Sequence, residues 1–150
     1  MVQVKGKLSK NDKQLVGIIL NEVPDYYNDF YITSDNMRLL INKNPSLLFS
    51  NLNKGDKIAF DKDGIALIIG FSDKSPRKYL KVLAKNKQIA YNLAKVLVEW
   101  NNNGIELYAK LKKTNPLIEI FKELGFEFKA SRGKEILLYR IAKKEIMNVR

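Results

Sequence analysis

The sequence predicts a mixed α+β fold, in which a central, mostly antiparallel sheet of six to seven strands is flanked by about four helices. Short apolar runs bounded by turn residues recur along the chain, as expected for strands, and they alternate with segments of helical apolar spacing. In the second half, a strand, a helix and another strand follow one another, which predicts a right-handed crossover between parallel strands. We expect one domain over residues 1–150, a length sufficient for a hydrophobic core.

The N-terminal part is expected to contain one strand and three short helices. Alternation of apolar and polar residues over residues 2–8 predicts the strand. Ser9 is a good N-cap residue, and Asp12 supplies an acidic side chain in the first turn that follows. The three helices are expected from Ser9 to Pro24, from Ser34 to Ile41 and from Asn44 to about Gly55.

The remainder of the chain is expected to supply most of the sheet. The segment Asp61-Lys-Asp-Gly64 is a good hairpin signal between the first two strands of this part. Asn115 and Pro116 fit the N-cap and first position of a helix, and Gly125 fits the position just after its end. The expected strands are 57–60, 65–71, 78–84, 105–112, 126–130 and 135–141, and the expected helices are 89–100 and 116–124.

The junction between the strand at 78–84 and the following helix is a candidate anion site. A strand that runs straight into a helix presents free backbone N–H groups together with the positive end of the helix dipole. Lys85 and Lys87 flank this point. The alternative is an ordinary strand–helix junction with solvated lysines.

The order of these elements and two short motifs resemble the core of the GNAT superfamily of N-acetyltransferases, over about residues 56–141. The family usually reads Arg/Gln-x-x-Gly-x-Gly/Ala in the loop after the first strand. Here Lys85 stands at the Arg/Gln position, Gln88 at the first Gly, and Ala90 at the Gly/Ala position. Asn115 and the sequence Leu124-Gly125-Phe126 match the second part of the pattern.

The resemblance implies an acyl-CoA-dependent N-acyltransferase that moves an acetyl group from acetyl-CoA to an amine. It implies that the pantetheine arm lies against the strand before the loop and that the pyrophosphate binds loop amides. Asn115 would add a polar contact with the cofactor, although a helix N-cap explains this residue equally simply. The implied cofactor-binding residues are Leu83, Ala84, Lys85, Asn86, Lys87, Gln88, Ile89, Ala90 and Asn115.

The proton donor for the departing thiolate is a separate question. The family often has a tyrosine where this chain has Phe121, and phenylalanine cannot donate a proton. Tyr108 and Tyr79 are the candidate substitutes, and each can also be read as a structural, partly buried tyrosine.

Composition excludes several kinds of site. The sequence contains no His and no Cys, so the usual zinc sites and Cys–His or Ser–His nucleophile pairs are excluded, and no metal site is expected. The start of the chain has no apolar signal region, and no apolar run is long enough to span a membrane. We therefore expect a cytoplasmic protein.

Charge suggests partners. The net charge is +11, and residues 74–98 carry seven basic residues and no acid. Such a stretch attracts phosphorylated cofactors or, weakly, nucleic acid; abundant lysine can equally serve solubility. The alternative function is therefore a catalytically inactive GNAT-like basic module that binds nucleic acid or a protein.

The sequence does not identify the amine acceptor. Acidic and aromatic residues over 25–31 would suit a cationic amine, but an amphipathic surface segment explains them as well.

Overall fold

The computed structural model describes residues 2–6, 8–22, 31–34, 37–40, 57–70, 77–100 and 106–141. The strands in these ranges are β1 (Gln3–Lys5), β2 (Tyr31–Ser34), β3 (Met37–Leu40), β4 (Lys57–Asp61), β5 (Gly64–Gly70), β6 (Arg77–Ala84), β7 (Glu106–Lys112), β8 (Glu127–Arg132) and β9 (Glu135–Ile141). The helices are α1 (Lys10–Glu22), α3 (Lys87–Trp100) and α4 (Leu117–Glu123). None of these helices has the length and hydropathy needed to cross a membrane.

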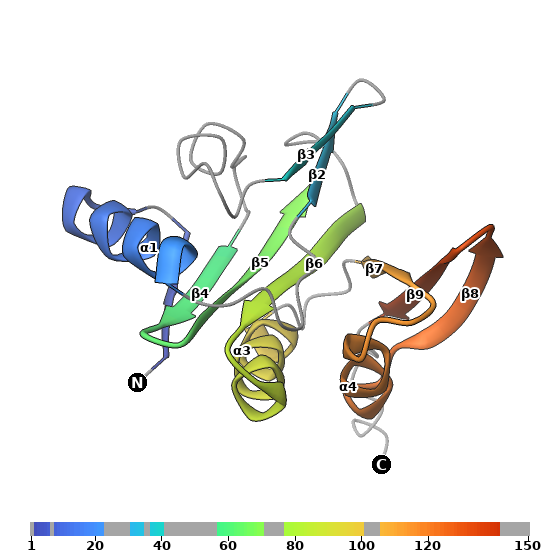
Figure 1. Ribbon diagram of the computed structural model, residues 1–150. Coiled ribbons are helices and arrows are strands. Elements are labelled where there is room, and N and C mark those ends of the chain that lie inside the picture. The colour runs from blue at the N-terminus through green and yellow to red at the C-terminus, as the bar shows by residue number, and fades with distance from the viewer. Residues whose placement is uncertain are drawn as a thin grey trace, which may run out of the picture.

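The main sheet has seven strands in the order β1-β4-β5-β6-β7-β9-β8 (Figure 1). Every neighbouring pair is antiparallel except β6 and β7, which are parallel and are joined by the crossover through α3. The mixed, mostly antiparallel sheet that the sequence predicts is therefore confirmed, including its single parallel pair.

The helix expected from Ser34 to Ile41 is a wrong prediction. The structure has an antiparallel hairpin there, in which Tyr31 pairs with Leu40 and Ser34 with Met37. Two residues separate the strands, Asp35 and Asn36, and both residue types favour two-residue hairpin connections. The β-branched residues Ile32 and Thr33 also favour a strand. The further helix expected at 44–55 lies outside the described residues.

The two faces of the sheet are covered differently. One face carries Ala66, Val82 and Leu107, which are fully buried in the main core cluster together with residues of α3 and α4. By strand alternation, Ile65 and Leu83 belong to the opposite face, and α1 packs against β5. Figure 1 shows α3 and α4 next to each other, with α1 apart from them at the β4 side of the sheet.

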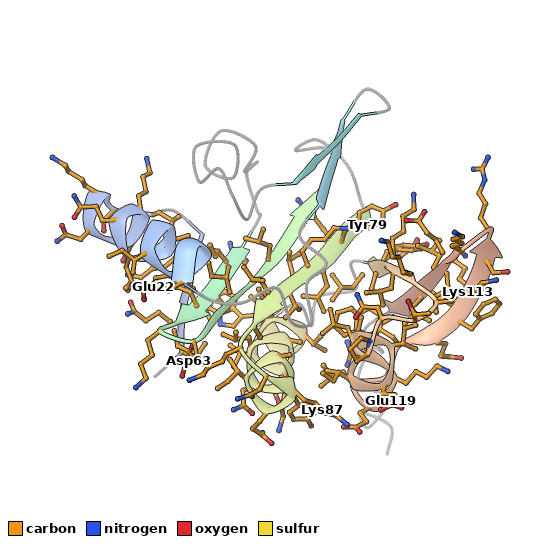
Figure 2. All side chains as sticks on the ribbon, in the orientation of Figure 1. Glu22, Asp63, Tyr79, Lys87, Lys113 and Glu119 are labelled. Atoms are coloured by element: carbon orange, nitrogen blue, oxygen red, sulfur yellow. The ribbon has the colours of Figure 1, made fainter. Side chains whose placement is uncertain are left out.

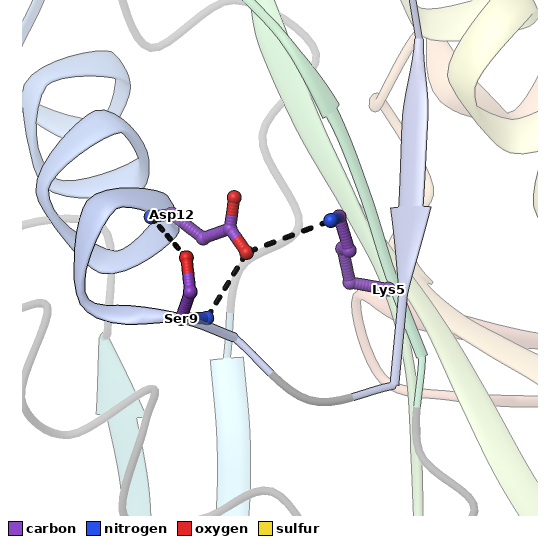
Figure 3. A network of polar contacts seen from close by, with 3 residues as sticks. All are labelled: Lys5, Ser9 and Asp12. Atoms are coloured by element: carbon purple, nitrogen blue, oxygen red, sulfur yellow. Dashed lines mark hydrogen bonds and ion pairs between the residues drawn. The ribbon is translucent and has the colours of Figure 1, made fainter.

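A reciprocal capping arrangement starts α1 (Figure 3). The Asp12 N–H donates to Ser9 Oγ at 3.1 Å, and the Ser9 N–H donates to Asp12 Oδ2 at 3.0 Å. Lys5 of β1 adds an ion pair with Asp12 at 3.8 Å. The backbone N–H and hydroxyl of Ser9, followed by the charge of Lys5, lower the pKa of Asp12 below its usual value.

Asp12→Asn is expected to reduce stability above the carboxyl's unfolded pKa and to have little effect at low pH. A lowered folded-state pKa means that the carboxylate stabilises the fold fully above the unfolded value, which is about 3.9. That contribution is lost as the pH falls through the folded value. Urea unfolding of both proteins at pH 7 and near pH 2.5 tests this. A constant difference between the proteins at both pH values would contradict it.

The end of α4 explains the Leu124-Gly125-Phe126 motif structurally. The Phe126 N–H donates to the Phe121 carbonyl at 3.0 Å, and the Gly125 N–H donates to the Lys122 carbonyl at 3.0 Å, which is a Schellman motif. Gly125 has a φ of +97°, which a residue with a side chain rarely adopts. The rings of Phe121 and Phe126 are 5.2 Å apart, so the motif closes over an apolar contact.

Gly125→Ala is expected to lower the free energy of unfolding by about 1–2 kcal/mol from the backbone alone. A Cβ there would also lie 3.2 Å from Arg140 Nε, which donates to the Leu124 carbonyl at 2.9 Å. Gly133→Ala is the matched control, because Gly133 has a φ of +59° and no atom within 4 Å of the added Cβ. Denaturant unfolding should show a larger loss of unfolding free energy for Gly125→Ala than for Gly133→Ala. Equal losses would mean that the close approach of the added Cβ to Arg140 has no effect on stability.

Candidate active site

The sheet opens between β6 and β7. These strands pair only at Arg77–Glu106, Lys78–Leu107 and Tyr79–Tyr108. On its other edge β6 stays paired with β5 as far as Ala84, and β7 stays paired with β9 as far as Lys112. Residues 80–84 and 109–112 therefore face each other without ladder bonds, and an unpaired strand edge offers backbone N–H and C=O groups to a ligand.

The helices that follow these strands begin at the open end of the split. β6 leads into α3 and the parallel β7 leads into α4, and the two helices are in contact. Lys87 in the first turn of α3 forms an ion pair with Glu119 of α4, at 3.6 Å between Nζ and Oε2 (Figure 2). A cationic side chain and a helix N-terminus thus lie at the mouth of the split.

The hydrogen bonds of the predicted phosphate loop divide its amides into two groups. Asn86 caps α3, because its Oδ1 accepts from the Ile89 N–H and its carbonyl accepts from the Ala90 N–H, each at 3.0 Å. The Lys85 N–H donates to the Asp63 carbonyl at 3.0 Å. Within the described ranges, the N–H groups of residues 86–88 have no acceptor, and these amides are the ones open to an anion.

Side chains of the loop are exposed from Lys85 to Gln88. Gln88 Nε2 donates to Asn92 Oδ1 at 3.0 Å, which directs this side chain along α3 and away from the helix N-terminus. Ala90 is fully buried in the core cluster, so only its backbone lies near the loop. A charged residue at Ala90 would therefore disrupt the core and cannot serve as a clean probe of phosphate binding.

The other predicted cofactor contacts lie on the two sides of the split. Leu83 and Ala84 are fully buried at the end of β6 and pair with Ile65 and Gly64. Asn115 precedes α4, and its Oδ1 accepts from the Leu117 N–H at 2.9 Å, as expected of an N-cap. The contacts of these residues with a cofactor remain predictions.

Gly64 fits the β4–β5 turn closely against this junction. A Cβ on Gly64 would lie 2.8 Å from the Leu83 carbonyl oxygen and 2.8 Å from Leu93 Cδ1 of α3. Gly64→Ala must therefore displace the end of β6 or α3, and we expect it to cost about 1–3 kcal/mol of unfolding free energy. Denaturant unfolding checks this, with Lys62→Ala in the exposed turn as the control. Stability like that of the wild type would contradict the close fit.

The two candidate tyrosines lie together where the split begins. Tyr79 and Tyr108 are paired across β6 and β7 with ring centroids 5.9 Å apart, and Tyr139 of β9 lies 6.2 Å beyond Tyr108. The Tyr108 side chain is 1% exposed, and its hydroxyl donates to Glu106 Oε2 at 2.5 Å. Tyr79 is half-buried. Phe121 is fully buried against Phe126, so a hydroxyl at this position would lie in the core.

The basic stretch is not one exposed face. Lys78 and Lys81 are only 5% and 6% exposed, because both lie in the central strand β6. Lys85, Lys87 and Lys95 are the exposed members among the described side chains. Glu119 also places an acid beside this stretch, which the sequence order does not reveal.

A pocket that the sequence analysis did not single out adjoins the start of the split. It has a volume of about 220 Å³, and its polar lining comes from Tyr79, Lys110, Ser131, Arg132 and Glu135. The sequence does show the charged residues Lys110, Arg132 and Glu135 within or beside predicted strands, and these residues were the available signal for a polar pocket. The strand register that brings β6, β7, β8 and β9 together could not be obtained from that signal alone.

Comparison with known proteins shows the fold. No protein-family model matches the chain, and no curated protein matches its sequence. Among solved structures, a mutant spermidine N-acetyltransferase from Vibrio cholerae is 11% identical with a TM-score of 0.63, over 99% of this chain and 98% of that one. A domain from Methanocaldococcus jannaschii is 19% identical with a TM-score of 0.62, over 94% and 98%.

A third similar structure is the PaiA N-acetyltransferase from Thermoplasma acidophilum in complex with coenzyme A. It is 16% identical with a TM-score of 0.59, over 94% of this chain and 99% of that one. These matches extend over nearly the whole length of each chain, although few residues are identical. The chain therefore has the fold of the GNAT-type N-acetyltransferases.

Proposed function

We propose that this chain is an acyl-CoA-dependent N-acetyltransferase, which moves an acetyl group from acetyl-CoA to an amine. The split between β6 and β7, with the N-terminus of α3 at its mouth, is the observation that carries the proposal. Two similar structures, of N-acetyltransferases from Vibrio cholerae and Thermoplasma acidophilum, are complexes with CoA, which supports it.

The residues at the split fit a long ligand with phosphates at one end and a thioester at the other. The amides of residues 86–88 and the side chains of Lys85 and Lys87 would hold the pyrophosphate. The unpaired edge of residues 80–84 would hydrogen-bond the amides of the pantetheine arm. From Tyr79 to Ala84 the strand spans roughly 17 Å, so the phosphate site and Tyr79 lie at opposite ends of it (Figure 2).

The reaction requires one bond to form, one to break and one proton to be supplied. The amine nitrogen bonds to the acetyl carbon, the carbon–sulfur bond breaks, and the thiolate leaves with the electron pair and takes up a proton. We assign this donation to Tyr79, because it borders both the split and the pocket. Tyr108 is a positioning residue, since its hydroxyl is committed to Glu106. Water accepts the proton that the amine loses and returns a proton to Tyr79.

Calorimetry with CoA and acetyl-CoA, combined with a thiol-release assay over a panel of amines, tests the proposal. Binding of both CoA species and amine-dependent thiol release are the expected results. Absence of heat at millimolar CoA would remove the proposal and leave the basic binding module as the function. Oligonucleotide binding that falls steeply with added salt would then support that alternative.

A further inference from the structure

The pocket beside the split lies on the sheet face opposite α3 and α4. Tyr79, Lys110 and Leu137 line it, and by strand pairing Tyr79 and Tyr108 share a face, as do Lys110 and Leu137. The alternate residues Leu107 and Ala109 of β7 point to the other face, where they join the core beneath α3 and α4. The pocket and the two helices therefore lie on opposite faces of the sheet at the split.

This position suits the second substrate of a transfer reaction. Tyr79 contributes to the pocket from β6 and Lys110 from β7, so the pocket extends across the point where the two strands separate. No ladder bonds join the two strands beyond Tyr79 and Tyr108, so the pocket adjoins the part of the sheet where a ligand in the split would lie.

The charges of the pocket indicate what it would bind. Lys110 is paired with Glu135 at 3.5 Å, so these two charges offset each other. Arg132 also lines the pocket, is exposed, and forms no ion pair with any residue in the described ranges. An unpaired guanidinium is the side chain best suited to a carboxylate, which it can hold through two parallel hydrogen bonds.

Neighbouring side chains add positive charge. Lys129 Nζ lies 4.8 Å from the centre of the Tyr139 ring, and Lys81 Nζ lies 5.7 Å from that of Tyr79. Among the described residues, the acids on this face are Glu106, Glu127 and Glu135. They are outnumbered by Lys81, Lys110, Lys129 and Arg132, so an anionic group is attracted more strongly than a polyamine. The acidic segment 25–31, which would favour a cationic acceptor, lies largely outside the described residues.

We infer that this pocket binds an acceptor that carries a carboxylate in addition to its amine, with Arg132 holding the carboxylate. The inference rests on the proposed acetyl transfer and names the substrate class of the same site. The acceptor's amine would then point toward Tyr79 and the split, where the carbon–nitrogen bond forms. Amino acids and peptides with a free carboxylate belong to this class, and simple polyamines do not.

Matched acceptor pairs that differ only by a carboxylate test the inference. Acetyl transfer to lysine is compared with transfer to cadaverine, and transfer to ornithine with transfer to putrescine. We expect kcat/KM to be about 10- to 100-fold higher for the carboxylate-bearing member, the value of a charge-assisted hydrogen-bonded contact. Arg132→Gln should remove this preference by raising KM for lysine, and it should not raise KM for cadaverine.

Lys134→Gln is the control, because it removes one positive charge from the same hairpin at an exposed residue that does not line the pocket. It should keep the preference for lysine. Equal use of lysine and cadaverine by the wild type, or the same loss in both variants, would overturn the inference while leaving acetyl transfer intact.

A binding measurement separates the two proposals. Lysine is titrated into the isotopically labelled full chain without CoA, and backbone NMR shifts are followed along β8 and β9. Arg132-dependent shifts with lysine, in a protein that binds no CoA, would support the carboxylate pocket and reject the transferase. Absence of shifts with lysine in the wild type would reject the pocket, whatever the result with CoA.

Discussion

Tyr79→Phe is expected to lower kcat for acetyl transfer about 100-fold, which is at the low end of the contribution of a positioned general acid. The substitution removes only the hydroxyl and keeps the ring that packs beside Tyr108. Binding of CoA should be unchanged, because the phosphate loop lies at the other end of β6. Steady-state kinetics and calorimetry on the same preparation separate these two effects.

Tyr108→Phe is the matched control, since the two rings are cross-strand neighbours. It removes a buried hydroxyl that donates to Glu106, and the loss should lower the free energy of unfolding by about 1–3 kcal/mol. The kcat for acetyl transfer by folded Tyr108→Phe should fall much less than that of Tyr79→Phe. A larger kinetic loss in Tyr108→Phe would reverse the assignment and make Tyr108 the donor.

Local signals in the sequence predict most of the fold. Ser9 with Asp12, Asn115 with Pro116, and Gly125 each satisfy or terminate backbone groups within a few residues, so their effect does not depend on distant parts of the chain. The helix predicted from Ser34 to Ile41 is wrong because Ser34 and Asp35 are equally good in a helix cap and in a turn. Only pairing between the two strands decides between these outcomes.

Features that depend on distant contacts could not be predicted in this way. No residue pattern in β6 or β7 predicts that the two strands stop pairing after Tyr79 and Tyr108. The burial of Lys78 and Lys81 likewise follows from the central position of β6, which strand order determines. The junction at 84–87 could be predicted because a strand that enters a helix is a local feature, and its role as an anion site stays a prediction. The ion pair of Lys87 with Glu119 depends on a distant contact and could not be predicted.

Lys87→Glu is expected to weaken CoA binding about 30- to 100-fold, through loss of a charge-assisted contact and introduction of a like charge beside the phosphates. The variant should remain folded, because Lys87 is exposed and a carboxylate in the first turn interacts favourably with the helix dipole. Lys95→Glu, at an exposed position later in α3, makes the same change in net charge and should bind CoA as the wild type does. Calorimetry of the three proteins with CoA at low ionic strength gives the comparison.

Glu119→Gln should have the opposite effect and tighten CoA binding. Glu119 holds Lys87 at 3.6 Å, so an incoming phosphate must compete with this carboxylate for the same ammonium group. The two side chains are 55% and 76% exposed, and an exposed pair of this kind is worth less than about 1 kcal/mol, so the gain should be about two- to five-fold. Added salt should shrink this gain, because it screens the ion pair. Weaker CoA binding by Glu119→Gln would mean that the ion pair positions Lys87 for the phosphate instead of competing with it.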